Sequence, residues 1–159
     1  MDYTRQAKEV LKIAEKSAKE MAHPYVGTEH LLLAFMRVCT GVAGQILSAN
    51  GVEEANLYKI VDELISPVGE VTFQEKPKRS PRLEYTLEES KEEAIRFQSE
   101  AIGTEHMLLA ILREPDSVAT RILLTLNRKS CRIRWKFSAW ISRNIKRSFK
   151  RHIKEKMGF

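Results

Sequence analysis

Cysteine is scarce in this chain, and its two cysteines belong to no recognisable metal or disulfide motif. Cys39 and Cys131 form no CxxC pair and are not spaced like metal ligands, so we interpret both as free thiols. No stretch holds the roughly 20 consecutive apolar residues that a membrane span requires. Residues 1–10, MDYTRQAKEV, carry an acid and alternate polar with apolar residues, unlike a secretory leader. We therefore expect a cytoplasmic protein that is not membrane-bound.

The motifs of nucleotide and metal chemistry are also missing. A phosphate-cradling GxxxxGK[ST] loop needs a lysine directly after a glycine, and none of the seven glycines has one. The four histidines form no HExxH motif, and no Ser/His/Asp group or carboxylate pair has a spacing typical of catalysis. The sequence therefore predicts a chain that is not an enzyme and that holds neither a cofactor nor a metal.

Positive charge is unevenly distributed along the chain. Residues 1–127 contain 15 Lys and Arg against 20 Asp and Glu, whereas residues 128–159 contain 12 against 1. The formal net charge of +6 is thus the sum of an acidic body and a strongly basic tail. Any argument for nucleic-acid or membrane binding from charge applies to the tail alone.

A repeat dominates what the sequence does contain. The stretch GTEHLLLAF begins at Gly27, and GTEHMLLAI begins 76 residues later at Gly103. At the same offset Ala18 matches Ala94, and the match ends at Arg128, where the charge balance reverses. A duplicated unit of this kind usually means a duplicated fold.

Each unit is predicted to be helical. Apolar residues recur at the three-and-four spacing of one helical face from Ala7 to Met21, with Thr4 as N-cap and His23-Pro24 as the stop. Further helices are predicted from Thr28, from about Val42 to Ala49, and from about Glu53 to Ile65. Asn50-Gly51 is expected to end the third of these helices, with the glycine in a left-handed conformation.

The second unit repeats this pattern, with Ser80 as N-cap, Pro81 as the first helical residue and Thr104 as the next N-cap. The prediction is an all-α fold made of two four-helix units related by a pseudo-twofold axis. The first repeat covers residues 3–65, a linker 66–79, the incomplete second repeat 80–127 and the basic tail 128–159. The tail replaces the last helix of the second repeat.

Residues 3–127 resemble the N-terminal double Clp repeat of the Clp unfoldases, with most similarity to the ClpC type. The doubled four-helix unit and the GTEH motif that opens the second helix of each copy carry the resemblance. It implies a recognition module, monomeric when isolated, that recruits unfolded or arginine-phosphorylated substrates and adaptor proteins. In full-length relatives this domain sits on a Clp ATPase ring.

The GTEH motif has a structural interpretation and a functional one. Structurally, Thr28 and Thr104 would be N-caps, the glutamates would favour the positive helix end, and His30 and His106 would pack between helices; caps and helix-end charges contribute about 0.3–2 kcal/mol each. The resemblance implies in addition that glutamate contacts the guanidinium of phosphoarginine while helix amides and a hydroxyl receive the phosphate. The candidate ligand-binding residues, with both glutamates expected outside the core, are Glu29, Glu105, Thr4, Ser80, Thr28 and Thr104.

The basic tail allows two interpretations. Trp135, Phe137, Trp140 and Phe149 alternate with Lys and Arg, a pattern that fits nucleic-acid or anionic-membrane binding. Alternatively, codons permitted by residues 128–138, read one nucleotide out of frame, can spell a sequence similar to the missing helix. We favour this frameshift interpretation, so no nucleic-acid partner and no membrane are expected.

Overall fold

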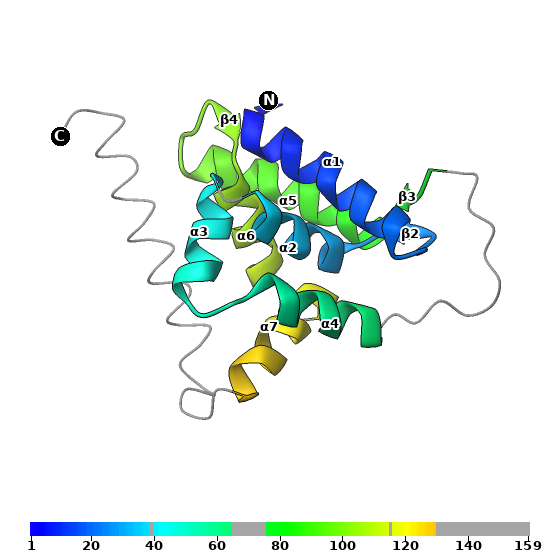
Figure 1. The fold of residues 1–159 in the computed structure, drawn as a ribbon. Helices are drawn as coiled ribbons and strands as arrows, with labels where there is room; N and C mark the ends of the chain where they lie inside the picture. Colours follow the sequence, from blue (N-terminus) through cyan, green and yellow to red (C-terminus); the bar gives the residue numbers. More distant parts are fainter. Residues whose placement is uncertain (39, 65–75, 115, 130–159) are drawn as a thin grey trace.

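The structure is a computed structural model, and it describes residues 1–38, 40–64, 76–114 and 116–129 (Figure 1). The first repeat contains β1 (Asp2–Tyr3), α1 (Arg5–Glu20), β2 (Tyr25–Val26), α2 (Thr28–Arg37), α3 (Val42–Ala49) and α4 (Glu54–Leu64). The second, extended by the last residues of the predicted linker and the first residues of the tail, contains β3 (Lys78–Arg79), α5 (Pro81–Arg96), β4 (Ala101–Ile102), α6 (Thr104–Arg113) and α7 (Val118–Lys129). The all-α class predicted from the sequence is confirmed, and the strands are only two residues long.

The first helix of each repeat begins as the sequence predicts. The Thr4 hydroxyl accepts a hydrogen bond from the Ala7 N–H at 3.2 Å, and the Ser80 hydroxyl accepts one from the Leu83 N–H at 3.1 Å. Pro81 is the first residue of α5. Both hydroxyls therefore satisfy an amide that would otherwise have no partner in the first helical turn.

The first helix ends earlier than the His23-Pro24 stop that the sequence predicts. It ends at Glu20, and Ala22 follows in a left-handed conformation with φ 58°. The His23 N–H then donates to the Ala18 carbonyl at 2.9 Å. In the second repeat Gln98 has φ 53° and the Ser99 N–H donates to the Ala94 carbonyl. The first helix of each repeat therefore ends in the same way, with one residue in the left-handed conformation, and this ending does not require a proline.

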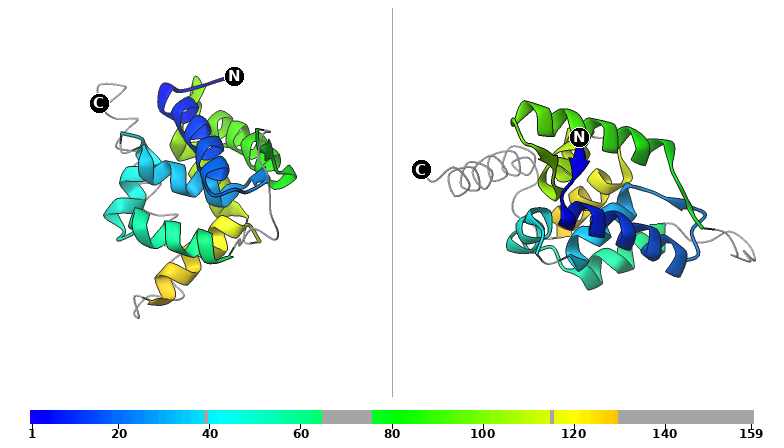
Figure 2. Two further views of the ribbon diagram at one scale, coloured as in Figure 1. Left: turned by 45° about the vertical axis from the view of Figure 1, so that its right-hand side comes forward. Right: turned by 90° about the horizontal axis from the view of Figure 1, so that it is seen from above.

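Helices α2 and α6 lie at the centre of the molecule. Helix α1 packs on α2 and α5 on α6, while α4 and α7 lie on the opposite side (Figures 1 and 2). The buried residues of both repeats form one hydrophobic cluster. Its largest fully buried side chains are Leu31, Leu32, Leu33, Phe35, Leu57, Leu83, Met107, Leu108, Ile111, Ile122 and Leu123. The two repeats thus share one core.

Contacts between the repeats are reciprocal. Helix α3 of the first repeat packs on α6, and α7 of the second packs on α2. Strand β1 pairs in parallel with β4, and β2 pairs in parallel with β3, so each strand pair joins the two repeats. This arrangement is the one that a twofold relation between the repeats would produce.

The third and fourth predicted helices of the first repeat are confirmed as α3 and α4, with Asn50 as C-cap and Gly51 at φ 81°. In the second repeat α7 continues to Lys129, past the point where the sequence match ends. The remainder of the tail, residues 66–75 of the predicted linker, Cys39 and Cys131 lie outside the described residues.

Candidate functional site

Two helices begin side by side at the end of each strand pair. Tyr3 of β1 is in register with Ile102 of β4, and the next residues, Thr4 and Gly103, are the N-caps of α1 and α6. The Thr4 N–H donates to the Ile102 carbonyl at 2.9 Å. Because the strands are parallel, the two helix N-termini begin at the same end of the strand pair, and their partial positive charges lie close together.

The second strand pair builds the same arrangement from the opposite repeats. Val26 is in register with Arg79, and Gly27 and Ser80 then cap α2 and α5. The Ser80 N–H donates to the Val26 carbonyl at 2.9 Å. We call the first arrangement the Glu105 site (Thr4 with residues 103–106) and the second the Glu29 site (Ser80 with residues 27–30).

Each site therefore combines the first helix of one repeat with the GTEH motif of the other. Thr4 lies beside the motif of Glu105, and Ser80 lies beside the motif of Glu29. Although the Thr4 and Ser80 hydroxyls accept a backbone hydrogen bond, each keeps a proton that it can donate to an anion. The sequence repeat identified these residues, but not which hydroxyl accompanies which glutamate.

Both glutamate carboxylates fold back over the glycine that precedes the helix. A Cβ atom built on Gly27 would lie 2.4 Å from both Glu29 carboxylate oxygens, and one on Gly103 would lie 2.4 and 2.5 Å from those of Glu105. Glycine at the N-cap is therefore what allows each carboxylate to approach the helix N-terminus. The sequence analysis did not assign Gly27 and Gly103 a role, although the repeated GTEH motif contains them.

The expectation that neither glutamate is in the core is wrong for Glu29. Glu29 is buried with 8% of its surface exposed, whereas Glu105 is half-buried. Burial raises the pKa of Glu29 above its usual value, and a hydrogen bond from its own backbone N–H opposes this rise. The helix N-terminus explains why a carboxylate is tolerated at such a buried position.

Thr28 and Thr104 are not the N-caps that the sequence predicts. Gly27 and Gly103 occupy the N-cap positions, and each threonine is the first helical residue. Both threonines are buried, and their hydroxyls accept hydrogen bonds from backbone amides at the start of helices in the other repeat. These bonds join Thr28 to the Ala119 N–H at 3.4 Å and Thr104 to the Ala43 N–H at 3.2 Å. Their hydroxyls thus connect the repeats, and only their backbone lies at the sites.

The histidines of the motif are buried, as the structural interpretation predicts. Nδ1 of His30 accepts from the Gly27 N–H, and Nδ1 of His106 accepts from the Gly103 N–H, each at 2.9 Å. An amide always donates, so Nδ1 carries no proton and the neutral rings are protonated at Nε2. Burial, with a smaller contribution from His23, lowers the pKa of His30 to about 3. His30 is therefore neutral at pH 7.

The two sites differ in the partner of the histidine and in the charges nearby. His30 Nε2 lies 2.7 Å from Nδ1 of His23, whereas His106 Nε2 lies 3.3 Å from the Ser99 hydroxyl. At the start of α5, Arg82 donates to Glu114 at 2.8 Å. The corresponding residue in α1 is Gln6, so an arginine is present near the Glu29 site and not at the matching position of the Glu105 site.

Two further features can be judged for the part of the chain that the structure describes, a metal centre and a membrane-spanning helix. No group of three or more His, Cys, Asp or Glu side chains there could hold a metal ion. No single described helix is long and apolar enough to cross a membrane, although α2 and α3 together, as a bent pair, reach the necessary length and composition.

The fold defines a class of protein: an all-helical domain made of two repeats. At each of the two junctions between the repeats, two helices begin side by side and form one candidate site. Residues 2–126 match the family model of the Clp repeat N-terminal domain, and the chain belongs to this family. It is 36% identical over 125 residues to a probable ATP-dependent Clp protease ATP-binding subunit of Chlamydia pneumoniae. It is 35% identical over 124 residues to the negative regulator of genetic competence ClpC/MecB of Bacillus subtilis.

These alignments cover 79% and 78% of this chain but only 15% of each relative. Among solved structures, the ClpV N-domain in complex with a VipB peptide is similar, with a TM-score of 0.65 and 22% identity. That alignment covers 89% of this chain and 88% of the other. The family resemblance inferred from the sequence is thereby confirmed, and the fold is that of Clp N-domains.

Proposed function

We propose that this domain recruits protein substrates and adaptor proteins to a Clp-type unfoldase, and that each composite site binds one phosphoarginine side chain. The observation that carries the proposal is the meeting of two helix N-termini beside one carboxylate at each repeat junction. The peptide bound to the ClpV N-domain supports the role of this fold in holding a polypeptide. The domain itself performs no chemistry in this scheme.

The geometry suits a ligand that carries a phosphate and a guanidinium next to each other. Amides at the two helix N-termini, and the hydroxyl of Thr4 or Ser80, would receive the phosphate. The carboxylate of Glu105 or Glu29 would accept from the guanidinium. Each ligand would thus contact both repeats, which explains why the motif has to occur twice for two sites to form.

Isothermal titration of the whole chain with phosphoarginine tests this proposal. We expect two sites, with arginine and phosphoserine binding far more weakly because each lacks half of the contacts. Glu105→Gln should abolish the site with Thr4, and Glu29→Gln the site with Ser80, since glutamine keeps the side-chain shape but loses the charge. Glu63→Gln, on the exposed surface of α4, is the control and should bind like the parent.

The result that would refute the phosphoarginine proposal is a parent chain that does not bind the ligand, or a Glu29/Glu105 double variant that binds it like the parent. Circular dichroism of each variant should match the parent, because the carboxylates lie at helix ends. In either contrary case the repeated glutamates would only stabilise the helix N-termini.

A further inference from the structure

The outward face of α1 carries an unbroken row of basic side chains. Arg5, Lys8, Lys12, Lys16 and Lys19 are all exposed, and we call them the basic stripe. At about 100° per residue they fall within a sector of about 80°. The buried residues of α1, which include Ala7, Ala14 and Ala18, lie on the opposite side of the helix. The stripe therefore faces solvent along the whole helix.

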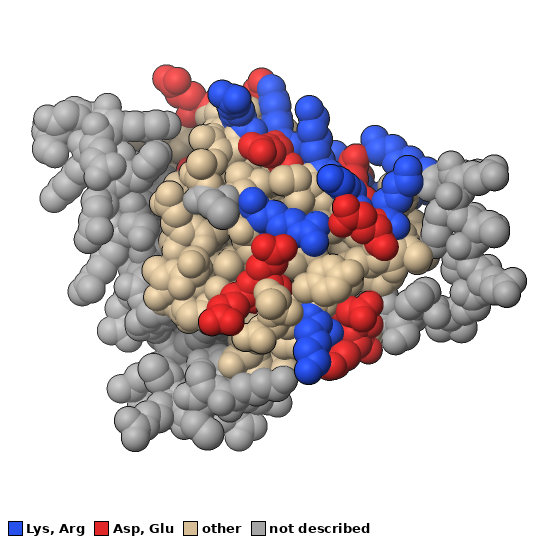
Figure 3. All heavy atoms as spheres, in the orientation of Figure 1, with Lys and Arg blue, Asp and Glu red and all other residues tan. Residues whose placement is uncertain are grey.

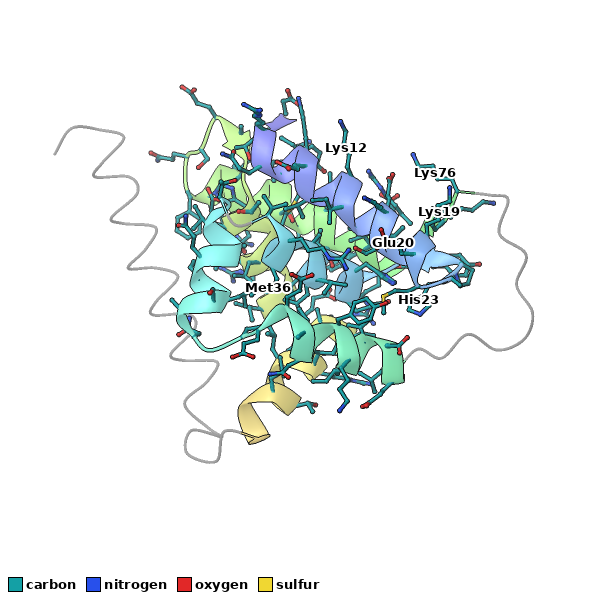
Figure 4. All side chains as sticks on the ribbon, viewed as in Figure 1. Lys12, Lys19, Glu20, His23, Met36 and Lys76 are labelled. Carbon is teal, nitrogen blue, oxygen red and sulfur yellow. The ribbon has the colours of Figure 1, made fainter. Side chains whose placement is uncertain are left out.

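Much of this charge is not neutralised within the molecule. Among the described residues no carboxylate lies within 4.0 Å of Arg5, Lys12 or Lys19, whereas Lys8 bonds to Asp2 and Lys16 lies 3.9 Å from Glu20. A shallow groove at the start of the stripe is lined by Arg5, Lys8, Glu9 and Lys12. Lys and Arg side chains gather along α1 in Figure 3, and Lys12 points away from the body in Figure 4.

Further cations extend the stripe at its far end. Lys76 and Arg79 lie 3.1 and 3.9 Å from Glu15 of α1 and neutralise its carboxylate. Lys19 and Lys76 lie near the same end of α1 (Figure 4). Helix α1 and residues 76–79, which also include Lys78, together contain eight Lys and Arg residues and three glutamates. The result is a positive ridge on a body, residues 1–127, that is acidic as a whole.

The second repeat shows that the fold does not need this charge. At the offset of 76, Lys8, Lys12 and Lys16 correspond to glutamates on α5, which are Glu84, Glu88 and Glu92. All three glutamates are exposed, and α5 forms a 16-residue helix just as α1 does. Since the matching helices form with either sign of charge at these positions, folding does not require the positive charge of the stripe. We therefore look for its role in binding.

We propose that the basic stripe docks an acidic polypeptide segment of a partner protein, rich in Asp and Glu and free of any phosphate. Helix α1 is about 24 Å long, which matches about seven residues of extended chain. Helix α1 contains no aromatic residue on which a base could stack. These features favour an acidic peptide over nucleic acid.

The position of the stripe gives the docking a role in recruitment. Arg5 directly follows Thr4 of the Glu105 site, and Arg79 at the other end directly precedes Ser80 of the Glu29 site. A segment bound to the stripe would therefore lie between the two composite sites. The glutamates of α5 would repel the same segment, which confines it to one of the two repeats.

Fluorescence anisotropy with a labelled deca-glutamate peptide tests the proposal on the whole chain at low salt. The stripe variant replaces Lys8, Lys12 and Lys19 by glutamate. The matched control replaces Lys59, Lys91 and Arg121, which are exposed on α4, α5 and α7, by glutamate, so both variants change the net charge equally. We expect the stripe variant to bind at least about tenfold more weakly and the control variant to stay within about threefold of the parent.

The control also separates the stripe from the basic tail, which both variants retain. Equal weakening in the two variants, or none in either, would overturn the proposal. Stripe-dependent binding of a single-stranded oligonucleotide or of anionic vesicles more tightly than the peptide would overturn it too. The stripe could instead bind α5 of a second copy of this chain. A parent chain that sediments as a dimer, and that dissociates when Glu84, Glu88 and Glu92 are replaced by lysine, would therefore also overturn the proposal.

Peptide binding is expected to persist in the Glu29→Gln and Glu105→Gln variants. The docking proposal therefore stands or falls separately from phosphoarginine binding. Equal helical circular dichroism in all variants would show that the substitutions change the surface and not the fold.

Discussion

The hydroxyl of Thr104 in one repeat accepts a hydrogen bond from the backbone N–H of Ala43 in the other, at 3.2 Å and across 61 residues of sequence. The reciprocal bond joins Thr28 to Ala119 at 3.4 Å, across 91 residues. Each threonine thus satisfies an amide in the first turn of a helix that belongs to the opposite repeat. The motif that builds the candidate sites also holds the two repeats together.

Thr104→Val is expected to lower the free energy of unfolding by about 1–3 kcal/mol, because it leaves the buried Ala43 amide without its acceptor while keeping the side-chain volume. Urea denaturation measures this difference. Thr125→Val, on the exposed side of α7, is the control and should stay within about 0.5 kcal/mol of the parent. A Thr104 variant as stable as its control would show that the bond between the repeats contributes nothing.

Gly27→Ala is expected to push the Glu29 carboxylate away from the helix N-terminus and to weaken phosphoarginine binding at that site. The reason is the 2.4 Å separation between the new Cβ and both carboxylate oxygens. A double-mutant cycle with Glu29→Ala checks the cause. The stability cost of Gly27→Ala should shrink when the carboxylate is already absent, and a cost that is unchanged would place the clash elsewhere.

The stability of the domain is expected to fall as pH decreases from about 6.5 towards 3. His30 has a folded-state pKa of about 3, below its ordinary 6.5, so in this window the unfolded chain binds a proton that the folded chain does not. The contribution reaches about 1.4 kcal/mol per pH unit. Glu29 acts in the opposite direction, because its raised pKa favours the folded state at low pH and loses this effect as pH rises.

His30→Asn separates this effect from the other titrating groups, since asparagine can accept from the Gly27 amide but does not titrate. The variant should be less stable than the parent at pH 7 and should lose less stability between pH 7 and 4, as measured by urea denaturation at each pH. An identical pH dependence in both proteins would contradict the role assigned to the buried imidazole.

Ala22→Gly is expected to stabilise the domain by about 1 kcal/mol, because Ala22 has φ 58° and a Cβ is unfavourable in the left-handed region. Ala55→Gly, at an exposed position in the first turn of α4, should instead destabilise, by at most about 1 kcal/mol. Thermal denaturation of the two variants should thus show shifts of opposite sign. A destabilised Ala22→Gly variant would mean that contacts of the methyl group outweigh the backbone strain.

Deletion of residues 130–159 is expected to leave phosphoarginine binding unchanged, because the residues of both candidate sites lie between Thr4 and His106. Titration calorimetry of the shortened chain is the measurement. If the shortened chain folds but no longer binds, the ligand site belongs to the tail, and the alternative of a basic binding arm would replace the recognition module.

Local sequence patterns were sufficient for the helices and several of their ends. The three-and-four spacing of apolar residues predicted α1, whose apolar face is buried, and the helices expected near residues 42–49 and 53–65 are α3 and α4. Thr4 and Ser80 were identified as caps because a cap bonds to an amide only three residues away. The resemblance to Clp repeats followed from the duplicated motif and needed no coordinates.

Only the tertiary structure decided how these parts combine into sites. Thr4 meets the motif of Glu105, and Ser80 meets that of Glu29, because short parallel strands pair across the repeats. Thr28 and Thr104 look like caps of their own helices in the sequence, yet their hydroxyls cap helices of the other repeat. Such contacts join residues far apart in the chain, and a local pattern of side-chain polarity carries no information about which distant amide a hydroxyl will meet.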